Sequence, residues 1–104
     1  MYKGITPTFT LTLPDTVDLT YATNVYVTFA DKNGDALLTK TTAELSIDVN
    51  EIEVYLTQEE TLKFPDSVSI QVNWTYNEGA VLKRACSEIV KTYFKHNLAD
   101  EVLQ

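Results

Sequence analysis

Apolar and polar residues alternate with a period of two along much of the chain. The pattern is clear at residues 9–13, where leucine and phenylalanine alternate with threonine, and again at residues 25–29. Successive side chains of a β-strand point to opposite faces of a sheet, so this alternation predicts half-buried strands. The cleanest stretch runs from Val68 to Tyr76, and we expect it to be the central strand.

Turn-forming residues separate the predicted strands. Asn33-Gly34 lies within the polar stretch 31–35, and Asn-Gly readily adopts the positive φ angles of a tight hairpin. Residues 48–50 predict a second hairpin turn, between strands at 45–47 and 52–56, and residues 77–79 predict a third, before a strand from about 80 to 88. Residues 89–96 combine helical spacing with β-branched and aromatic content, and we interpret them as a strand.

One short helical segment interrupts the strands. Thr57-Gln58-Glu59-Glu60 matches a capping box, in which the threonine hydroxyl and the glutamate carboxylate satisfy each other's free amides at a helix start. Pro65 disfavours a helical conformation for the residue before it. The sequence therefore predicts one short helical turn near residues 58–63.

The number and order of these elements indicate the fold class. Seven to eight short strands follow one another through turns, without the strand-helix-strand alternation of a parallel sheet. We therefore expect an all-β protein: a single domain over residues 1–104 that forms a two-sheet antiparallel β-sandwich of immunoglobulin-like size. The immunoglobulin Cys…Trp…Cys signature is absent, so this likeness concerns architecture alone.

Composition and charge indicate where the protein is made and which partners it does not bind. One cysteine cannot form an intramolecular disulfide, and neither a signal peptide nor an apolar run long enough to cross a membrane is present. We expect synthesis in the cytoplasm, without membrane insertion. The formal net charge of −7 opposes nucleic-acid binding, which needs a basic surface.

The charge is distributed unevenly, and this suggests how the chain associates. Residues 81–96 carry four cations, two of them Lys83 and Arg84, against one carboxylate, while the other residues are strongly acidic. The basic strand could lie across its own sheet from Glu51 or Glu53, or it could meet the acidic face of another copy. Sequence alone leaves both arrangements open.

Residues with catalytic or metal-binding chemistry are isolated from suitable partners. We expect His96 to be a surface residue and Cys86 a small core side chain. Asp31 begins a stretch that resembles a calcium loop, but the residues required at the sixth and twelfth positions are missing. Glu51, Glu53, Glu59 and Glu60 are expected to be solvated. The sequence therefore predicts no enzyme, no cofactor and no metal site.

The aromatic residues offer a second kind of site. Trp74 lies within the apolar stripe and is expected in the core, whereas Tyr26 and Tyr55 point away from the predicted core faces. Exposed aromatics on a sheet often mark a contact surface, although cross-strand packing explains them equally well. Together with Glu51, Glu53, Lys83 and Arg84, these two tyrosines are the candidate interface residues.

Four segments carry a resemblance to a group of known proteins: Pro7 to Pro14, Asn24 to Phe29, Leu56 to Thr61 and Val72 to Tyr76. In these strand patterns the chain resembles short β-rich structural proteins of phages and prophages of Gram-positive bacteria, and it is similar to the N-terminal domains of some baseplate proteins. The resemblance implies a virion or tail component that is a homo-oligomer or binds other virion or tail proteins.

Two functions follow as expectations. The first is a non-enzymatic structural or adaptor component of a phage or prophage tail or baseplate, made in the host cytoplasm and then carried in the virion. The alternative is a recognition module that binds carbohydrate or peptide through exposed aromatics such as Tyr26 and Tyr55.

Overall fold

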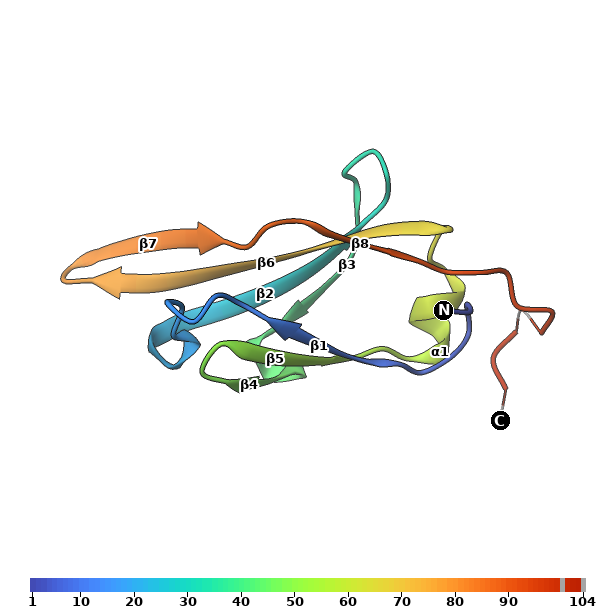
Figure 1. Ribbon diagram of the computed structural model, residues 1–104, viewed down its shortest axis with the longest axis horizontal. Helices are drawn as coiled ribbons and strands as arrows, with labels where there is room; N and C mark the ends of the chain where they lie inside the picture. Colours follow the sequence, from blue (N-terminus) through green and yellow to red (C-terminus); the bar gives the residue numbers. More distant parts are fainter. Residues whose placement is uncertain (100, 104) are drawn as a thin grey trace.

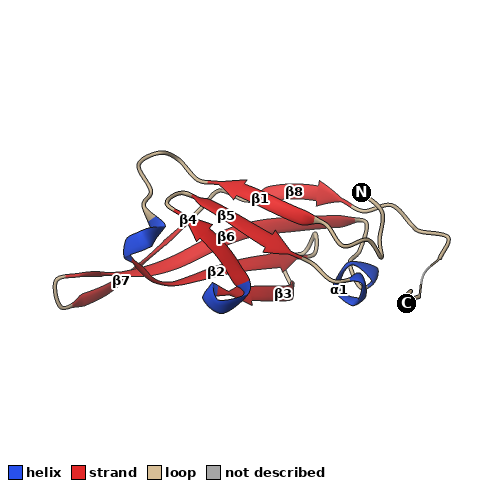
Figure 2. Cartoon of the chain, turned by 90° about the horizontal axis from the view of Figure 1, so that it is seen from below, coloured by secondary structure: helices blue, strands red, loops and turns tan. Residues whose placement is uncertain are grey.

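The computed structural model describes residues 1–99 and 101–103 and confirms an all-β sandwich of two antiparallel sheets (Figures 1 and 2). The strands are β1 (Thr8–Thr12), β2 (Ala22–Ala30), β3 (Ala36–Thr41), β4 (Leu45–Asp48), β5 (Glu51–Tyr55), β6 (Ser67–Glu78), β7 (Val81–Cys86) and β8 (Val90–Tyr93). The smaller sheet has the order β1-β5-β4. The larger has the order β3-β2-β6-β7, with β8 also paired to β6.

The core lies between the two sheets and is built from the predicted alternating positions. Its members are apolar residues of both sheets and of the segments that connect them: Leu13, Leu19, Val25, Val27, Phe29, Ile52, Val54, Leu56, Phe64, Val68, Ile70, Val72 and Phe94. Phe29, Phe64 and Phe94 form a continuous aromatic row, with neighbouring ring centroids 5.5 and 5.3 Å apart. Burial of this apolar surface is the main force that holds the sheets together.

β6 is central, as the sequence predicts. It pairs with β2 along one edge, and with β8 and then β7 along the other. Between β7 and β8 the chain leaves the regular ladder at Ser87, whose amide donates to the Val72 carbonyl at 2.8 Å and whose hydroxyl accepts from the Val72 amide at 2.9 Å. The serine hydroxyl thus takes the place of a backbone carbonyl as acceptor for the Val72 amide. Residues 81–93 therefore follow β6 with only a short interruption between β7 and β8.

The end of β6 and the whole of β7 project beyond the small sheet. This projecting hairpin (residues 73–86) extends away from the body on the side opposite α1 (Figures 1 and 2). Gly79 opens its two-residue turn with a φ of 63°, a conformation that glycine adopts at little cost. The molecule is elongated, with extents of 52 × 29 × 21 Å, and the hairpin forms one of its two ends (Figure 1).

The predicted helix and its capping box are confirmed. Helix α1 (Gln58–Leu62) begins after Thr57, whose hydroxyl accepts from the Glu60 amide at 3.2 Å, while the Glu60 carboxylate accepts from the Thr57 amide at 2.8 Å. Two short 3-10 turns, η1 (Leu19–Tyr21) and η2 (Thr42–Glu44), were not predicted. The segment η2 carries the chain from β3 in one sheet to β4 in the other.

The predicted hairpin turns are present. In the first, the Asp31 carboxylate accepts from the amides of Asn33 and Asp35, and Gly34 has a φ of 85°. In the second, Val49 has a φ of 49°, which is unfavourable for a β-branched residue. The carbonyls of Val49 and Asn50 accept from the amides of Leu19 and Leu13, so the loop after β1 holds this turn in place.

Three predictions about individual side chains need correction. The Glu60 side chain, expected to be solvated, is only 20% exposed because its carboxylate pairs with Lys40. Cys86 is exposed rather than buried, because its register opposite Asn73 turns its side chain to the outer face of the large sheet. Trp74 packs against the core but is only partly buried, since the small sheet ends before it reaches that part of β6. His96 is exposed, as expected.

Candidate functional site

The expected interface residues occupy two different sheets. Tyr26 is in β2, and Lys83 and Arg84 are in β7, all within the large sheet, whereas Glu51, Glu53 and Tyr55 are in β5 of the small sheet. Tyr26 and Tyr55 point outward from opposite layers of the sandwich. The two tyrosines therefore cannot form one binding platform.

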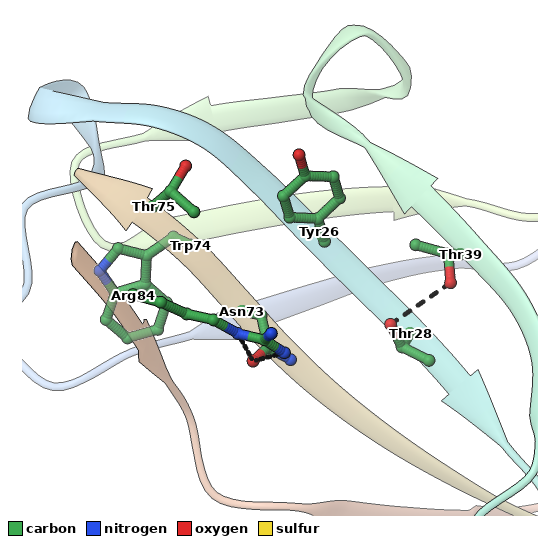
Figure 3. Close-up of a pocket in the computed structure, with 7 residues that line it drawn as sticks. All are labelled: Tyr26, Thr28, Thr39, Asn73, Trp74, Thr75 and Arg84. Atoms are coloured by element: carbon green, nitrogen blue, oxygen red, sulfur yellow. Dashed lines mark hydrogen bonds between the residues drawn. The ribbon is translucent and has the colours of Figure 1, made fainter. Parts of the chain in front are cut away.

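The outer face of the large sheet has a shallow hollow of about 400 Å³ (Figure 3). Tyr26 and Arg84 both line it, and Asn73 lies opposite Tyr26 in the neighbouring strand. The Arg84 guanidinium donates twice to the Asn73 side-chain oxygen, at 3.2 and 3.0 Å, while Thr28 and Thr39 bring hydroxyls to the same face. The hollow therefore presents a phenol ring beside a cation and several hydrogen-bonding groups.

The projecting hairpin is the second feature of interest. Val81 and Leu82, next to its turn, are 58% and 62% exposed. Lys83 forms an ion pair with Glu78 at 2.9 Å, and neither Lys83 nor Arg84 pairs with Glu51 or Glu53 among the described residues. The cross-sheet ion pairing considered from the sequence is therefore not formed within the chain.

The outer surface of the small sheet is acidic. Glu51, Glu53 and Tyr55 are all exposed on β5, where they lie opposite Thr12, Thr10 and Thr8 of β1. We call the surface formed by Glu51 and Glu53 the acidic face. Tyr55 stands at its end, 54% exposed.

An apolar groove opens between the two sheets on the side where β1 faces β7 and β8. It has a volume of about 630 Å³, and its floor and walls include Leu11, Leu13, Val17, Ile70, Val72 and Trp74, with Glu88 at the same opening. Both strands beside it are sheet edges: within residues 1–99 and 101–103, β1 pairs only with β5, and β7 only with β6. Free strand edges beside an apolar groove form a ready site for an added strand.

Buried charge occurs away from these surfaces, where α1 meets β3. Lys40 is 7% exposed, and its ammonium lies 2.9 Å from Glu60 Oε2. Partial burial tends to raise the pKa of the Glu60 carboxyl, but hydrogen bonds from Lys40 and Thr57 and the charge of Lys40 outweigh it and hold that pKa below its ordinary value of 4.5. This ion pair connects α1 to β3, at the edge of the large sheet.

Among the described residues, no group of three histidine, cysteine, aspartate or glutamate side chains is placed to hold a metal ion. In the same part of the chain, no helix has the length and apolar character needed to cross a membrane. No protein-family model matches the chain, and no curated protein or solved structure matches it either.

Sequence reasoning missed the apolar groove. Its lining residues belong to the same alternating pattern as the core, so the pattern cannot separate a covered position from an open one. The groove depends on strand order, which leaves β1 and β7 at the edges of different sheets. An unusually long predicted strand at 68–76 was the available signal that part of one sheet would extend past the other.

Proposed function

We propose that this chain is a non-enzymatic structural or adaptor component of a phage or prophage tail or baseplate, which acts by binding other virion proteins. The projecting hairpin supports this most directly. It carries two adjacent exposed apolar side chains, Val81 and Leu82, at the far end of an elongated molecule. A partner that covered them would gain from removal of their apolar surface from water.

The strand edges beside the hairpin support the same function. β1 and β7 have unpaired backbone edges, and they adjoin an apolar groove. Strand addition supplies main-chain hydrogen bonds, while a groove that accepts alternate side chains supplies selectivity. The resemblance of the strand segments to phage structural proteins agrees with a role in assembly.

The proposal is tested on particles from a bacterium that encodes the chain. Phage production is induced, the particles are purified by density gradient, and their proteins are quantified by mass spectrometry. We expect the chain in purified particles, in a fixed ratio to a tail protein, and absent from fractions that contain capsids alone. Its absence from tailed particles would reject the proposed function.

One observation favours recognition of a carbohydrate or peptide instead. The hollow on the large sheet combines the Tyr26 ring with Arg84 and Asn73, groups that stack on and hydrogen-bond to polar ligands. Chemical-shift titration with cell-wall sugars and peptides tests this function. Binding that Tyr26→Ala abolishes and Tyr55→Ala leaves intact would favour it, because Tyr55 lies on the other sheet.

A further inference from the structure

The hydrogen-bond pattern of β1 identifies which of its backbone groups are free. Pro7 and Leu13, just outside the strand, both bond to the β5 side: the Pro7 carbonyl accepts from Leu56, and the Leu13 amide donates to Asn50. Bonding direction alternates along an antiparallel strand. The amides and carbonyls of Thr8, Thr10 and Thr12 therefore point away from β5, toward the unpaired edge.

The same argument applies to β7. The Ser87 amide bonds to Val72 of β6, and the alternate residues Val81, Lys83 and Ala85 continue that pattern toward the turn. Leu82, Arg84 and Cys86 consequently direct their backbone groups to the free edge of the hairpin. Each free edge thus offers three residues whose backbone groups can pair with another strand.

These two edges also match in the orientation of their side chains. Residues directly opposite each other in an antiparallel pair place their side chains on the same face. If β7 added to β1, Arg84 would lie beside the threonines on the outer surface of the small sheet, with Glu51 and Glu53 one strand farther, within reach of its long side chain. Val81, Lys83 and Ala85 would then all face the apolar groove, where Glu88 lies at the opening.

Charge selects among the possible edge pairings. A symmetric β1–β1 contact would bring two acidic faces together, and a symmetric β7–β7 contact would place two basic strands side by side. The mixed β7–β1 contact instead brings a cation to an acidic surface. Like charges placed together disfavour association, whereas opposite charges fix the partner and the register.

Building on the assembly function above, we propose that β7 of one copy adds as an antiparallel strand to β1 of a second copy. The small sheet of the second copy is extended, and its apolar groove is covered by the hairpin. The contact is heterologous, because the two surfaces differ, so each copy donates one hairpin and accepts another. Such contacts build a ring if the rotation closes and a filament if it does not.

Sedimentation velocity on the purified chain tests the contact. We expect association that increases with protein concentration and weakens between about 0.05 M and about 0.5 M salt, as screening increases. Arg84→Glu and Glu53→Arg should each raise the dissociation constant by about tenfold or more, because each variant places like charges at the contact. Lys32→Glu is the matched control for Arg84→Glu: it makes the net charge more negative by the same amount, but in the turn between β2 and β3, and should leave association unchanged.

Mixing the two variants gives the sharpest result. In an equimolar mixture of Arg84→Glu and Glu53→Arg, every contact between unlike copies pairs opposite charges, so association should return toward the wild-type level. A symmetric β1–β1 or β7–β7 contact predicts a different pattern, in which at least one of the two single variants associates as well as the wild type. If Lys83 and Arg84 instead protect the edge from pairing, Arg84→Glu would leave association unchanged or strengthen it.

The backbone contact has its own test. Thr10→Pro removes an amide that points away from β5, so the fold should persist while strand addition is lost. Thr10→Ala keeps the amide and serves as its control. In the associated state, hydrogen exchange should slow at Thr8, Thr10, Thr12, Leu82, Arg84 and Cys86.

Three results would overturn the proposal: a wild-type monomer up to about 1 mM, failure of the mixed variants to recover association, or unchanged exchange at both edges on association. None of these depends on virions. A monomeric chain that is found in tail particles would refute this contact and leave the proposed function standing. A self-associating chain that is absent from particles would reject the proposed function and leave this contact standing.

Discussion

Lys40 and Glu60 join the edge of the large sheet to the helix. The ammonium of Lys40 lies 3.0 Å from Glu60 Oε1 and 2.9 Å from Oε2, while Glu60 also closes the capping box by accepting from the Thr57 amide. Glu44 is more distant, at 3.9 Å. The Glu60 carboxylate thus caps the start of α1 and also neutralises the charge of the buried Lys40.

The first prediction concerns this pair. Lys40→Met should lower the free energy of unfolding by about 2 kcal/mol, because it leaves the partly buried Glu60 without its cation. The double variant Lys40→Met, Glu60→Gln should recover part of that loss, since no unpaired charge remains. Urea denaturation measures both values, and equal losses in the single and double variants would contradict this account.

The second prediction concerns pH. The pKa of Glu60 is lower in the folded chain than its ordinary value of 4.5. Its contribution to stability is therefore complete above the ordinary value and is lost as the pH falls through the lower folded-state pKa. The stability difference between wild type and Glu60→Gln should be constant near neutral pH and shrink below about pH 4.5. A difference that stays constant into acid would exclude this linkage.

The third prediction concerns the strained turn between β4 and β5. Val49 has a φ of 49°, and asparagine tolerates this region far better than a β-branched residue. Val49→Asn should therefore raise the free energy of unfolding by about 1 kcal/mol. Val49→Thr keeps the branching and should give no gain. Thermal unfolding of the three chains compares them, and a gain in the threonine variant would point away from backbone strain.

The fourth prediction concerns the join between β7 and β8. Ser87→Ala removes the acceptor of the Val72 amide, and should cost about 1 to 2 kcal/mol because that amide loses its partner. Ser87→Thr retains a hydroxyl and should cost less. Hydrogen exchange at the Val72 amide provides the local readout: its rate should rise in the alanine variant under native conditions, and an unchanged rate would contradict a protective role of the Ser87 hydroxyl.

Local signals in the sequence predicted most of the fold. Alternation gave the strands, Gly34 and Gly79 marked turns, and the Thr57 to Glu60 spacing gave the helix start. Each of these depends on neighbours within a few residues. The 3-10 turns η1 and η2 lack comparably strong local signals and were missed.

Features that depend on strand order could not be predicted in this way. The burial of Lys40 depends on Glu60, which is 20 positions away, and nothing near Lys40 indicates it. Cys86 is exposed because its register opposite Asn73 turns it to the outer face of the large sheet, although its residue type favours burial. Glu51, Glu53 and Tyr55 are exposed, as their places in the alternating pattern predicted, but the division of the candidate interface residues between two sheets required the structure.

The two ends of the described chain are held to each other. The Met1 ammonium donates to the Tyr93 carbonyl, 92 positions away, and the Lys3 amide donates to the Lys95 carbonyl at 2.9 Å. Contacts so distant in sequence are slow to form, because a long loop must close before they are gained. During synthesis residues 1–3 leave the ribosome before residues 93–95, so these contacts form only after β8 has emerged. Residues 1–3 are thus held in place only late in folding, although they are made before most of the domain.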